Sequence, residues 1–185
     1  MKVAVYSGSF NPLHVGHMAI MEYLTRTAGF DVVYLVVSPQ NPFKDASNAL
    51  TGAERYAAAV EAVKRHPELR VKVDDIELGM DPPHYTIRTL DALREREKDN
   101  SFTLVVGADN LPRFEGWKDY SRILLEYGVV VFPREGFHPV RDVRHLKAVN
   151  PLFRIKVLRA PQVDISSTRI REGLSRGEDM SSVLM

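Results

Sequence analysis

The stretch VAVYSGSFNPLHVGH, residues 3–17, runs from an apolar segment through a glycine-bearing loop into a segment with helical spacing. Residues 3–7 are apolar and rich in β-branched side chains, which is typical of a buried strand. In the loop, Gly8 is expected to let the backbone turn sharply. Because the free amides at the start of a helix favour an anion, this stretch predicts a phosphate-binding loop between a strand and a helix.

The alternation of strand and helix continues along the chain. Short β-branched runs predict strands at residues 3–7, 32–38, 71–73, 102–106, 129–132 and 155–158. Helical spacing predicts helices at residues 15–27, 52–65, 85–98 and 120–127. Several strands are apolar almost throughout, as expected when helices cover both faces of a parallel sheet. We therefore expect an α/β fold with a doubly wound, mostly parallel sheet, in a single domain over residues 1–185.

Bulk composition limits the classes of partner. Charged residues make up 26% of the chain and the formal net charge is +1, so no electrostatic footprint for a nucleic-acid polymer or a membrane is expected. The absence of cysteine excludes a disulfide scaffold and a thiolate metal site. The opening residues MKVAVYSGSF carry too short an apolar run for a secretory signal. We expect a cytoplasmic protein and leave its oligomeric state open.

His14 and His17 are the candidate catalytic residues of the first loop. Three residues apart, they share one face at the helix start and can reach the same anion. Imidazolium or neutral imidazole N–H donors there would hold oxygens of a triphosphate as charge moves to the leaving pyrophosphate. Two alternatives stay open for such a pair: a helix cap or core contact, and a metal site, although no third ligand follows a clear pattern. The loop has neither a Walker motif nor the G-x-G-x-x-G spacing.

The segment GSFNPLHVGH resembles the G-x-F-(N/D)-P-x-H-x-G-H signature of the nucleotidyltransferase superfamily, whose members transfer a nucleoside monophosphate from a triphosphate. The resemblance implies a Rossmann-like fold and an ATP site in this loop formed by Gly8, Ser9, Phe10, His14 and His17. In that family the two histidines contact the ATP phosphates and stabilise the transition state. The acceptor's own phosphate attacks, so positioning and electrostatics carry the catalysis.

A second anion-binding segment lies near the end of the chain. Residues 165–171 read ISSTRIR before a helical stretch, and their hydroxyls could be ordinary helix caps. They also resemble the I-S-S-T-x-I-R motif of the same superfamily, which binds the ATP phosphates. The resemblance assigns to ATP the residues Ile165, Ser166, Ser167, Thr168 and Arg171. Arg169 and Arg171 are both candidates for phosphate contact; the family motif favours Arg171, and a solvated position is the open alternative for Arg169.

The middle of the chain indicates the acceptor. Residues 107–117 resemble the G-x-D-x-L-x-x-F-x-x-W segment of bacterial nicotinate mononucleotide adenylyltransferases. This resemblance implies that Gly107 and Asp109 belong to the ATP site. It also implies that Asp109 serves the mononucleotide site by binding ribose hydroxyls and that Trp117 stacks on the pyridine ring. The chemistry agrees, since a flat ring gains from an aromatic face and a carboxylate accepts two hydrogen bonds from a diol. A packing role for Trp117 is the alternative.

Four further positions are assigned to the mononucleotide by the same resemblance. Lys44, in a loop similar to N-P-P-H-K, would contact its phosphate, and the amides at Tyr85 and Thr86 would receive the nicotinate carboxylate. Arg134 and Asn11 complete this group. Two departures from the family stand out: Phe43 replaces the usual histidine, and the chain ends at Met185, before an expected further helix with a Tyr-Ile pattern.

The expected reaction is the transfer of AMP from ATP to nicotinate mononucleotide, giving nicotinate adenine dinucleotide and pyrophosphate in NAD biosynthesis. Mg²⁺ would bridge triphosphate oxygens and be held mainly by them, without a dedicated protein site. Two rivals stay open: a sister transferase acting on phosphopantetheine, and a binding module without turnover. A dinucleotide-dependent oxidoreductase would need the glycine fingerprint that the chain lacks.

Overall fold

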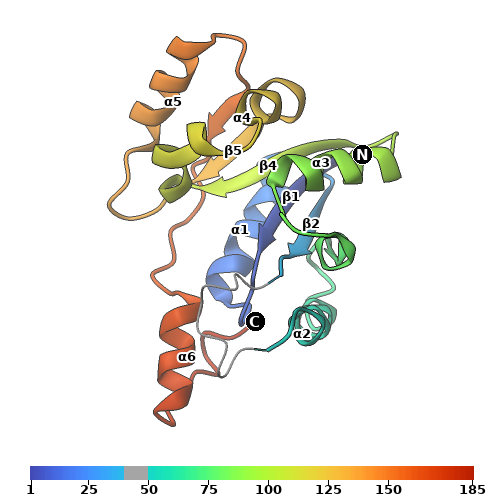
Figure 1. Cartoon of the computed structure of the whole chain (residues 1–185). Coiled ribbons are helices and arrows are strands. Elements are labelled where there is room, and N and C mark those ends of the chain that lie inside the picture. Colours follow the sequence, from blue (N-terminus) through green and yellow to red (C-terminus); the bar gives the residue numbers. More distant parts are fainter. Residues whose placement is uncertain (40–49) are drawn as a thin grey trace.

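The computed structural model describes residues 1–39 and 50–185, and its strands form one six-stranded sheet (Figure 1). In chain order these are β1 (Lys2–Gly8), β2 (Val32–Val37), β3 (Val71–Asp74), β4 (Ser101–Gly107), β5 (Val129–Phe132) and β6 (Ile155–Val157). Neighbouring strands all pair in parallel, in the order β3-β2-β1-β4-β5-β6. The predicted strands and the doubly wound α/β fold are confirmed. The domain bounds of 1–185 stay a prediction.

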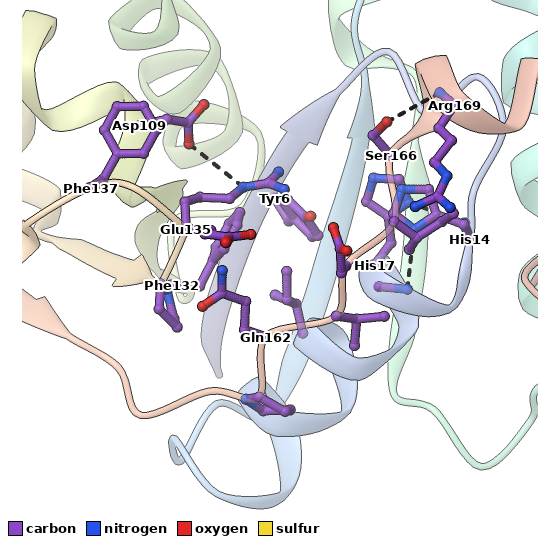
Figure 2. A pocket seen from close by; sticks show the side chains of 18 residues that line it. Tyr6, His14, His17, Asp109, Phe132, Glu135, Phe137, Gln162, Ser166 and Arg169 are labelled. Carbon is purple, nitrogen blue, oxygen red and sulfur yellow. Dashed lines mark hydrogen bonds and ion pairs between the residues drawn. The ribbon is translucent and has the colours of Figure 1, made fainter. Parts of the chain in front are cut away.

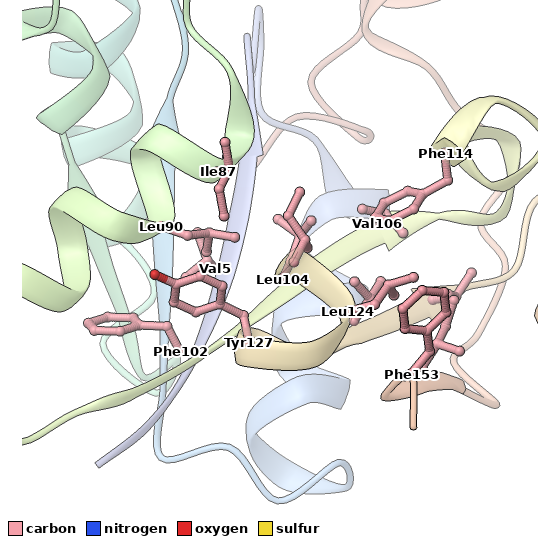
Figure 3. Packing of buried hydrophobic residues seen from close by; sticks show 14 of the residues in the cluster. Val5, Ile87, Leu90, Phe102, Leu104, Val106, Phe114, Leu124, Tyr127 and Phe153 are labelled. Atoms are coloured by element: carbon pink, nitrogen blue, oxygen red, sulfur yellow. The ribbon is translucent and has the colours of Figure 1, made fainter. Parts of the chain in front are cut away.

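Helices cover both faces of the sheet, as its apolar strands require. α1 (Val15–Arg26) and α2 (Gly52–Lys64) pack on the face that carries Ala4 and Tyr6 of β1. α3 (Thr86–Arg96) packs on the opposite face, where Figure 3 shows Ile87 and Leu90 beside the strands that carry Val5 and Leu104, and Leu93 belongs to the same cluster. Alternate residues of β1 therefore belong to two separate apolar clusters, one on each face.

The structure contains one helix that the sequence did not predict, and one predicted helix has a different form. α5 (Pro139–Val149) is not among the predicted helices, although Val140, Val143 and Leu146 recur at helical spacing. Leu146 is its one buried residue, and Val143 is partly buried against the same core cluster. The helix expected at residues 120–127 is split into α4 (Tyr120–Arg122) and a π-helical turn, η3 (Ile123–Tyr127). The N–H of Gly128 donates to the Ile123 carbonyl at 2.8 Å, which widens this last turn.

Shorter helical segments follow several strands and complete the fold: η1 (Ile76–Gly79), η2 (Ala108–Gly116) and α6 (Ser167–Ser175). η2 starts directly after β4 and contains Pro112, so its turns are of the tight 3₁₀ type. α6 lies away from the sheet, beside the loop that follows β1 (Figure 1).

The strand order reverses between β1 and β4, which are neighbours at the centre of the sheet. Their carboxyl ends carry Gly8 and Gly107, the starting points of two of the predicted site segments. In open α/β sheets ligands bind outside the carboxyl ends of strands at such a reversal. The fold therefore directs attention to the loops after β1 and β4.

None of the helices in residues 1–39 and 50–185 has both the length and the apolar character needed to span a bilayer.

Candidate active site

Two adjoining clefts open at the reversal of strand order. The first has a volume of about 410 Å³ and its lining includes His14, His17, Ile165, Ser166 and Arg169 (Figure 2). The second has a volume of about 340 Å³ and its lining includes Gly8, Ser9, Thr86, Gly107 and Trp117. Each is within the size range of small-molecule sites. The two histidines of the first loop and Ser166 of the last predicted segment thus face one cavity.

The two clefts share five lining residues, which we call the junction: Tyr6, His17, Asp109, Phe132 and Arg134. Figure 2 shows Tyr6 between Asp109 on one side and the two histidines on the other. Because the junction residues line both cavities, the two clefts adjoin at these side chains.

The loop between β1 and α1 bends at Phe10. Its φ of 48° lies in the left-handed region, which non-glycine residues rarely adopt and which is concentrated at functional sites. The sharp turn expected at Gly8 is therefore located two residues later. At Gly8 the constraint is close packing, because an added Cβ would come within 3.1 Å of the Phe10 ring.

His14 and His17 form a capping box at the start of α1. The main-chain N–H of Gly16 donates to His14 Nδ1 at 3.1 Å, and that of His14 donates to His17 Nδ1, also at 3.1 Å. The two rings stack with centroids 3.7 Å apart. Since both Nδ1 atoms accept hydrogen bonds, the proton of each neutral imidazole is on Nε2. Each ring is therefore a fixed N–H donor. The capping alternative and the phosphate-donor hypothesis are compatible, because they use different ring nitrogens.

Both imidazoles are held in the neutral form at physiological pH. Burial lowers the pKa of His14 to about 4, and the nearby Arg134 charge lowers it further. For His17, burial is again the main cause, followed by the charges of His14 and Arg134, and the pKa falls to about 3. Of the two donor forms considered for these residues, the structure favours the neutral imidazole over imidazolium.

Gly16, between the two histidines, permits the last predicted segment to approach them. An added Cβ would lie 2.9 Å from the His14 ring and 3.3 Å from Ile165 Cγ2. α6 is fastened to the same loop by two hydrogen bonds: Ser167 Oγ donates to the Pro12 carbonyl at 2.9 Å, and Arg171 Nη1 donates to the Asn11 carbonyl at 2.6 Å. The two predicted ATP segments are thus joined directly.

The two arginines of α6 point to different places. Arg169 lines the first cleft, and Figure 2 shows its side chain extending toward His14. Arg171 holds the Asn11 carbonyl and Thr168 Oγ1 instead. Both arginines are candidates for phosphate contact from the sequence, with Arg171 favoured by the family motif; of the two, only Arg169 lines the first cleft. Ser166 caps α6 by accepting from the Arg169 N–H at 3.1 Å.

Asp109 and Arg134 face each other at the junction. Asp109 Oδ1 lies 3.7 Å from Arg134 Nε, and both side chains are nearly half exposed. Arg134 also lies over the Phe132 ring, 5.2 Å from its centroid. An added Cβ at Gly107 would meet the Asp109 carboxylate and lie 3.1 Å from the Phe132 ring, so a larger residue here would displace Asp109 from its present position. A carboxylate and a guanidinium are thus presented together to whatever occupies the junction.

The second cleft combines an aromatic face with a helix start. Trp117 is partly buried, and its ring lies 4.7 Å from that of Phe114, at an interplanar angle of 31°. Thr86, in the same cleft, is the first residue of α3. No side chain caps this helix start, and the N–H groups of Thr86 and Ile87 have no partner within the part of the chain that the structure describes. An uncapped helix start beside an aromatic ring suits an anionic aromatic ligand.

Some predicted residues lie outside both linings. These are Asn11, Tyr85, Thr168 and Arg171. Lys44 and Phe43 lie outside the described residues. Five residues assigned to ATP line the second cleft and not the first, namely Gly8, Ser9, Phe10, Gly107 and Ser167. The binding roles themselves stay predictions.

Sequence reasoning missed two residues of the junction, Tyr6 and Phe132. Both lie in strands and belong to the apolar cluster on the α1 face, so the strand pattern predicts them only as core. A useful signal would have been their position at the carboxyl ends of strands on either side of the reversal. Within the described residues, no cluster of three or more His, Asp or Glu side chains has the arrangement of a metal site.

A family model, two sequence relatives and a solved structure all relate this chain to the same class of nucleotidyltransferase. Residues 5–173 match the cytidylyltransferase-like family. A Bacteroides fragilis protein named "Probable nicotinate-nucleotide adenylyltransferase" is 36% identical over 97% of this chain and 85% of its own length. A Flavobacterium johnsoniae protein of the same name is 35% identical over the full chain and 92% of its own length. The solved Plasmodium falciparum nicotinic acid mononucleotide adenylyltransferase in complex with NaAD superposes with a TM-score of 0.75, at 16% identity, over 97% of this chain and 87% of that one.

Proposed function

The chain belongs to the cytidylyltransferase-like family and, through its full-length relatives, to the nicotinate-nucleotide adenylyltransferases, and we propose that it transfers AMP from ATP to nicotinate mononucleotide. The products are nicotinate adenine dinucleotide and pyrophosphate. The single observation that carries this proposal is the pair of clefts with a common junction. A reaction that joins two nucleotides through their phosphates needs such an arrangement of sites.

The chemistry at the junction is an in-line displacement. A phosphate oxygen of the mononucleotide forms a bond to the α-phosphorus of ATP, while the bond from that phosphorus to the bridging oxygen of the β-phosphate breaks. The electron pair leaves with pyrophosphate, so no protein nucleophile is needed. Holding both phosphates at one point turns a bimolecular encounter into an effectively unimolecular step.

The first cleft supplies donors for the triphosphate. The Nε2–H groups of His14 and His17 are oriented by the bonds at Nδ1, and Arg169 lines the same cavity. As charge builds on the leaving pyrophosphate, such fixed donors stabilise it without having to reorganise. Neutral imidazoles act here as hydrogen-bond donors, so no proton has to be transferred from them.

A divalent cation, Mg²⁺, fits this cleft as a companion of ATP. Asp109 faces Arg134, which leaves Glu135 and Asp164 as the lining carboxylates that would assist the triphosphate oxygens in holding the ion. Few protein ligands are what magnesium requires when it binds with a nucleotide. When bound, the ion would neutralise charge on the triphosphate.

The second cleft suits the mononucleotide. Trp117 offers a face for the pyridine ring, and the N–H of Thr86, at the start of α3 in the same cleft, is available to the nicotinate carboxylate. A negative charge gains from both the N–H donor and the dipole of α3, whereas the neutral amide of nicotinamide mononucleotide gains less. This is the physical reason for proposing nicotinate over nicotinamide mononucleotide.

Release of pyrophosphate from ATP, measured with a panel of acceptors, tests the proposal. We expect rapid release with nicotinate mononucleotide, slower release with nicotinamide mononucleotide, and only background release with phosphopantetheine. Faster turnover with phosphopantetheine would identify a sister transferase. Binding of ATP and nicotinate mononucleotide in a calorimeter without pyrophosphate release would identify a binding module. The cytoplasmic location and the absence of nucleic-acid and membrane partners stay predictions.

A further inference from the structure

Tyr6 lies in β1, at the wall between the two clefts. It is one of the five junction residues and lines both cavities. Its side chain comes from the strand itself and not from a loop. Figure 2 shows it between Asp109 and the histidine pair. A group on a central strand is positioned more rigidly than one on a loop, which makes this residue suited to a site where two phosphates must meet.

The Tyr6 hydroxyl has no hydrogen-bond partner within residues 1–39 and 50–185, although the residue is only 5% exposed. A buried phenol normally finds a partner. The hydroxyl is also not sealed from the cavity, because in the described part of the chain Arg55 Nη2 is the one fully buried side-chain nitrogen or oxygen without a partner. The unused donor of Tyr6 therefore faces the space where a ligand would bind.

Three aromatic neighbours fix the ring of Tyr6. Phe10 and Phe132 lie edge-on to it at centroid distances of 5.3 and 5.9 Å, and the His17 ring is tilted against it at 6.1 Å. With the ring held from several sides, the hydroxyl has a defined position relative to His17. It is a preorganised donor in the same sense as the histidine Nε2 groups.

The charge state of Tyr6 also suits donation. Burial raises the pKa of this phenol well above its ordinary value, and the charge of Asp109 acts in the same direction while that of Arg134 opposes both. The hydroxyl therefore keeps its proton at any physiological pH. A neutral O–H beside an arginine and an imidazole N–H forms a cluster of donors, which is complementary to a phosphate oxygen.

We propose that Tyr6 contacts the substrates directly, donating its hydroxyl hydrogen to a phosphate oxygen at the point where the ATP cleft and the mononucleotide cleft meet. This inference rests on the proposed adenylyltransfer and adds a substrate-contacting residue to it. A hydrogen bond from the junction strengthens as negative charge is redistributed around the α-phosphorus, so Tyr6 contributes to turnover as well as to binding.

Tyr6→Phe tests the proposal, because it removes only the hydroxyl and keeps the ring contacts. Tyr34→Phe is the matched control: Tyr34 is also a buried strand tyrosine, but it belongs to the cluster on the opposite face and its hydroxyl donates to Glu97 at 2.6 Å. We expect kcat/KM for pyrophosphate release to fall about 10- to 100-fold in Tyr6→Phe, as for loss of a hydrogen bond to a charged group, and to stay within about threefold of wild type in Tyr34→Phe.

Inhibition constants locate the contact. Nicotinate adenine dinucleotide, which has phosphates at the junction, should inhibit Tyr6→Phe about tenfold less tightly than wild type, whereas adenosine, which has no phosphate, should inhibit both equally. Equal loss for adenosine would overturn the phosphate assignment. Unchanged kcat/KM in Tyr6→Phe, or an equal fall in Tyr34→Phe, would overturn the role of Tyr6. Wild-type enzyme without pyrophosphate release would instead count against the proposed adenylyltransfer itself.

Discussion

The first turns of α1 and α3 both face the active site, but they present donors to it in different ways. At α1, the side chains of His14 and His17 accept main-chain N–H groups at Nδ1 and present Nε2 outward. At α3, no side chain caps the helix, and the main-chain N–H of Thr86 is itself left for a ligand. One helix start offers imidazoles and the other offers its own backbone.

This difference matches the two tasks that we propose. A leaving pyrophosphate changes its charge during the reaction, and donors beyond the helix end can be placed around the oxygens where that charge develops. A nicotinate carboxylate keeps its charge throughout, so the dipole and free amides of a helix start suffice. Substitutions at the two helix starts should therefore affect different kinetic quantities.

The largest effect is expected for His17→Ala. Removing one preorganised donor for the transition state costs about 2.7–4 kcal/mol, or about 10²–10³ in kcat. Because the interaction strengthens in the transition state, KM for ATP should change much less than kcat. Steady-state release of pyrophosphate at saturating nicotinate mononucleotide measures both quantities.

His17→Asn separates the two nitrogens of this ring. The asparagine side-chain oxygen can replace Nδ1 as acceptor for the His14 N–H, but it has no donor at the place of Nε2. We expect kcat to stay as low as in His17→Ala, while the thermal unfolding midpoint returns toward that of wild type. Recovery of kcat in His17→Asn would mean that the histidine acts only as a helix cap.

A smaller and more selective effect is expected for Thr86→Pro. Thr86 is the first residue of α3, where proline is tolerated because its N–H has no partner in the helix. Tyr85 is already extended, with ψ of 136°, as a residue before proline must be. The loss of one N–H should raise KM for nicotinate mononucleotide about 10- to 100-fold, with little change for nicotinamide mononucleotide.

Thr86→Ala is the control for this substitution, because it removes the hydroxyl and keeps the main-chain N–H. We expect it to retain the preference for nicotinate mononucleotide. If the alanine variant loses that preference as fully as the proline variant does, the side chain and not the backbone selects the substrate.

The same contrast explains what sequence could reveal. Short apolar runs predicted the six strands of the sheet in the described residues, because short runs rich in β-branched residues are typical of buried strands. The two histidines could be predicted as site residues because the imidazole side chain is itself the donor group, and the residue type alone reveals it. The donors at α3 belong to the backbone, so side-chain chemistry does not reveal them, and Tyr85 and Thr86 could be predicted only through the resemblance to a family motif. Tyr6 was hidden for another reason, since a tyrosine that packs in a strand and one that also reaches a ligand look alike in sequence.

The sequence also could not predict which side chains of α6 face the cleft. Arg169 and Arg171 are two residues apart, and positions with that spacing do not share a helix face. Which of them faces the cleft depends on how α6 docks, and that is decided by the bonds of Ser167 and Arg171 to the loop after β1. Such docking follows from tertiary contacts across most of the chain, which a local motif does not contain.

The smallest predicted effect concerns folding stability as a function of pH. In the unfolded chain histidine titrates near pH 6.5, whereas in the folded protein the pKa of His14 is about 4 and that of His17 about 3. Between these limits the unfolded state binds more protons, so the free energy of unfolding falls as pH decreases from about 6.5 toward 4. From pH 7.5 to 5, His17 accounts for at most about 2 kcal/mol of this loss.

Urea unfolding of wild type and His17→Asn at pH 7.5 and 5 measures this contribution. Asparagine cannot be protonated, so the variant should lose less stability than wild type over this range. His145→Gln is the control, because His145 is an exposed histidine paired with Glu115 on the surface. Other titrating groups interfere little in this pH range. Asp74 and Asp91 have arginine partners that lower the pKa of their carboxyl groups, so the stability they add to the fold is lost mainly below pH 5. An equal loss of stability in wild type and His17→Asn would show that His17 is not held neutral by the fold, and the assignment of both histidines as neutral donors would then have to be abandoned.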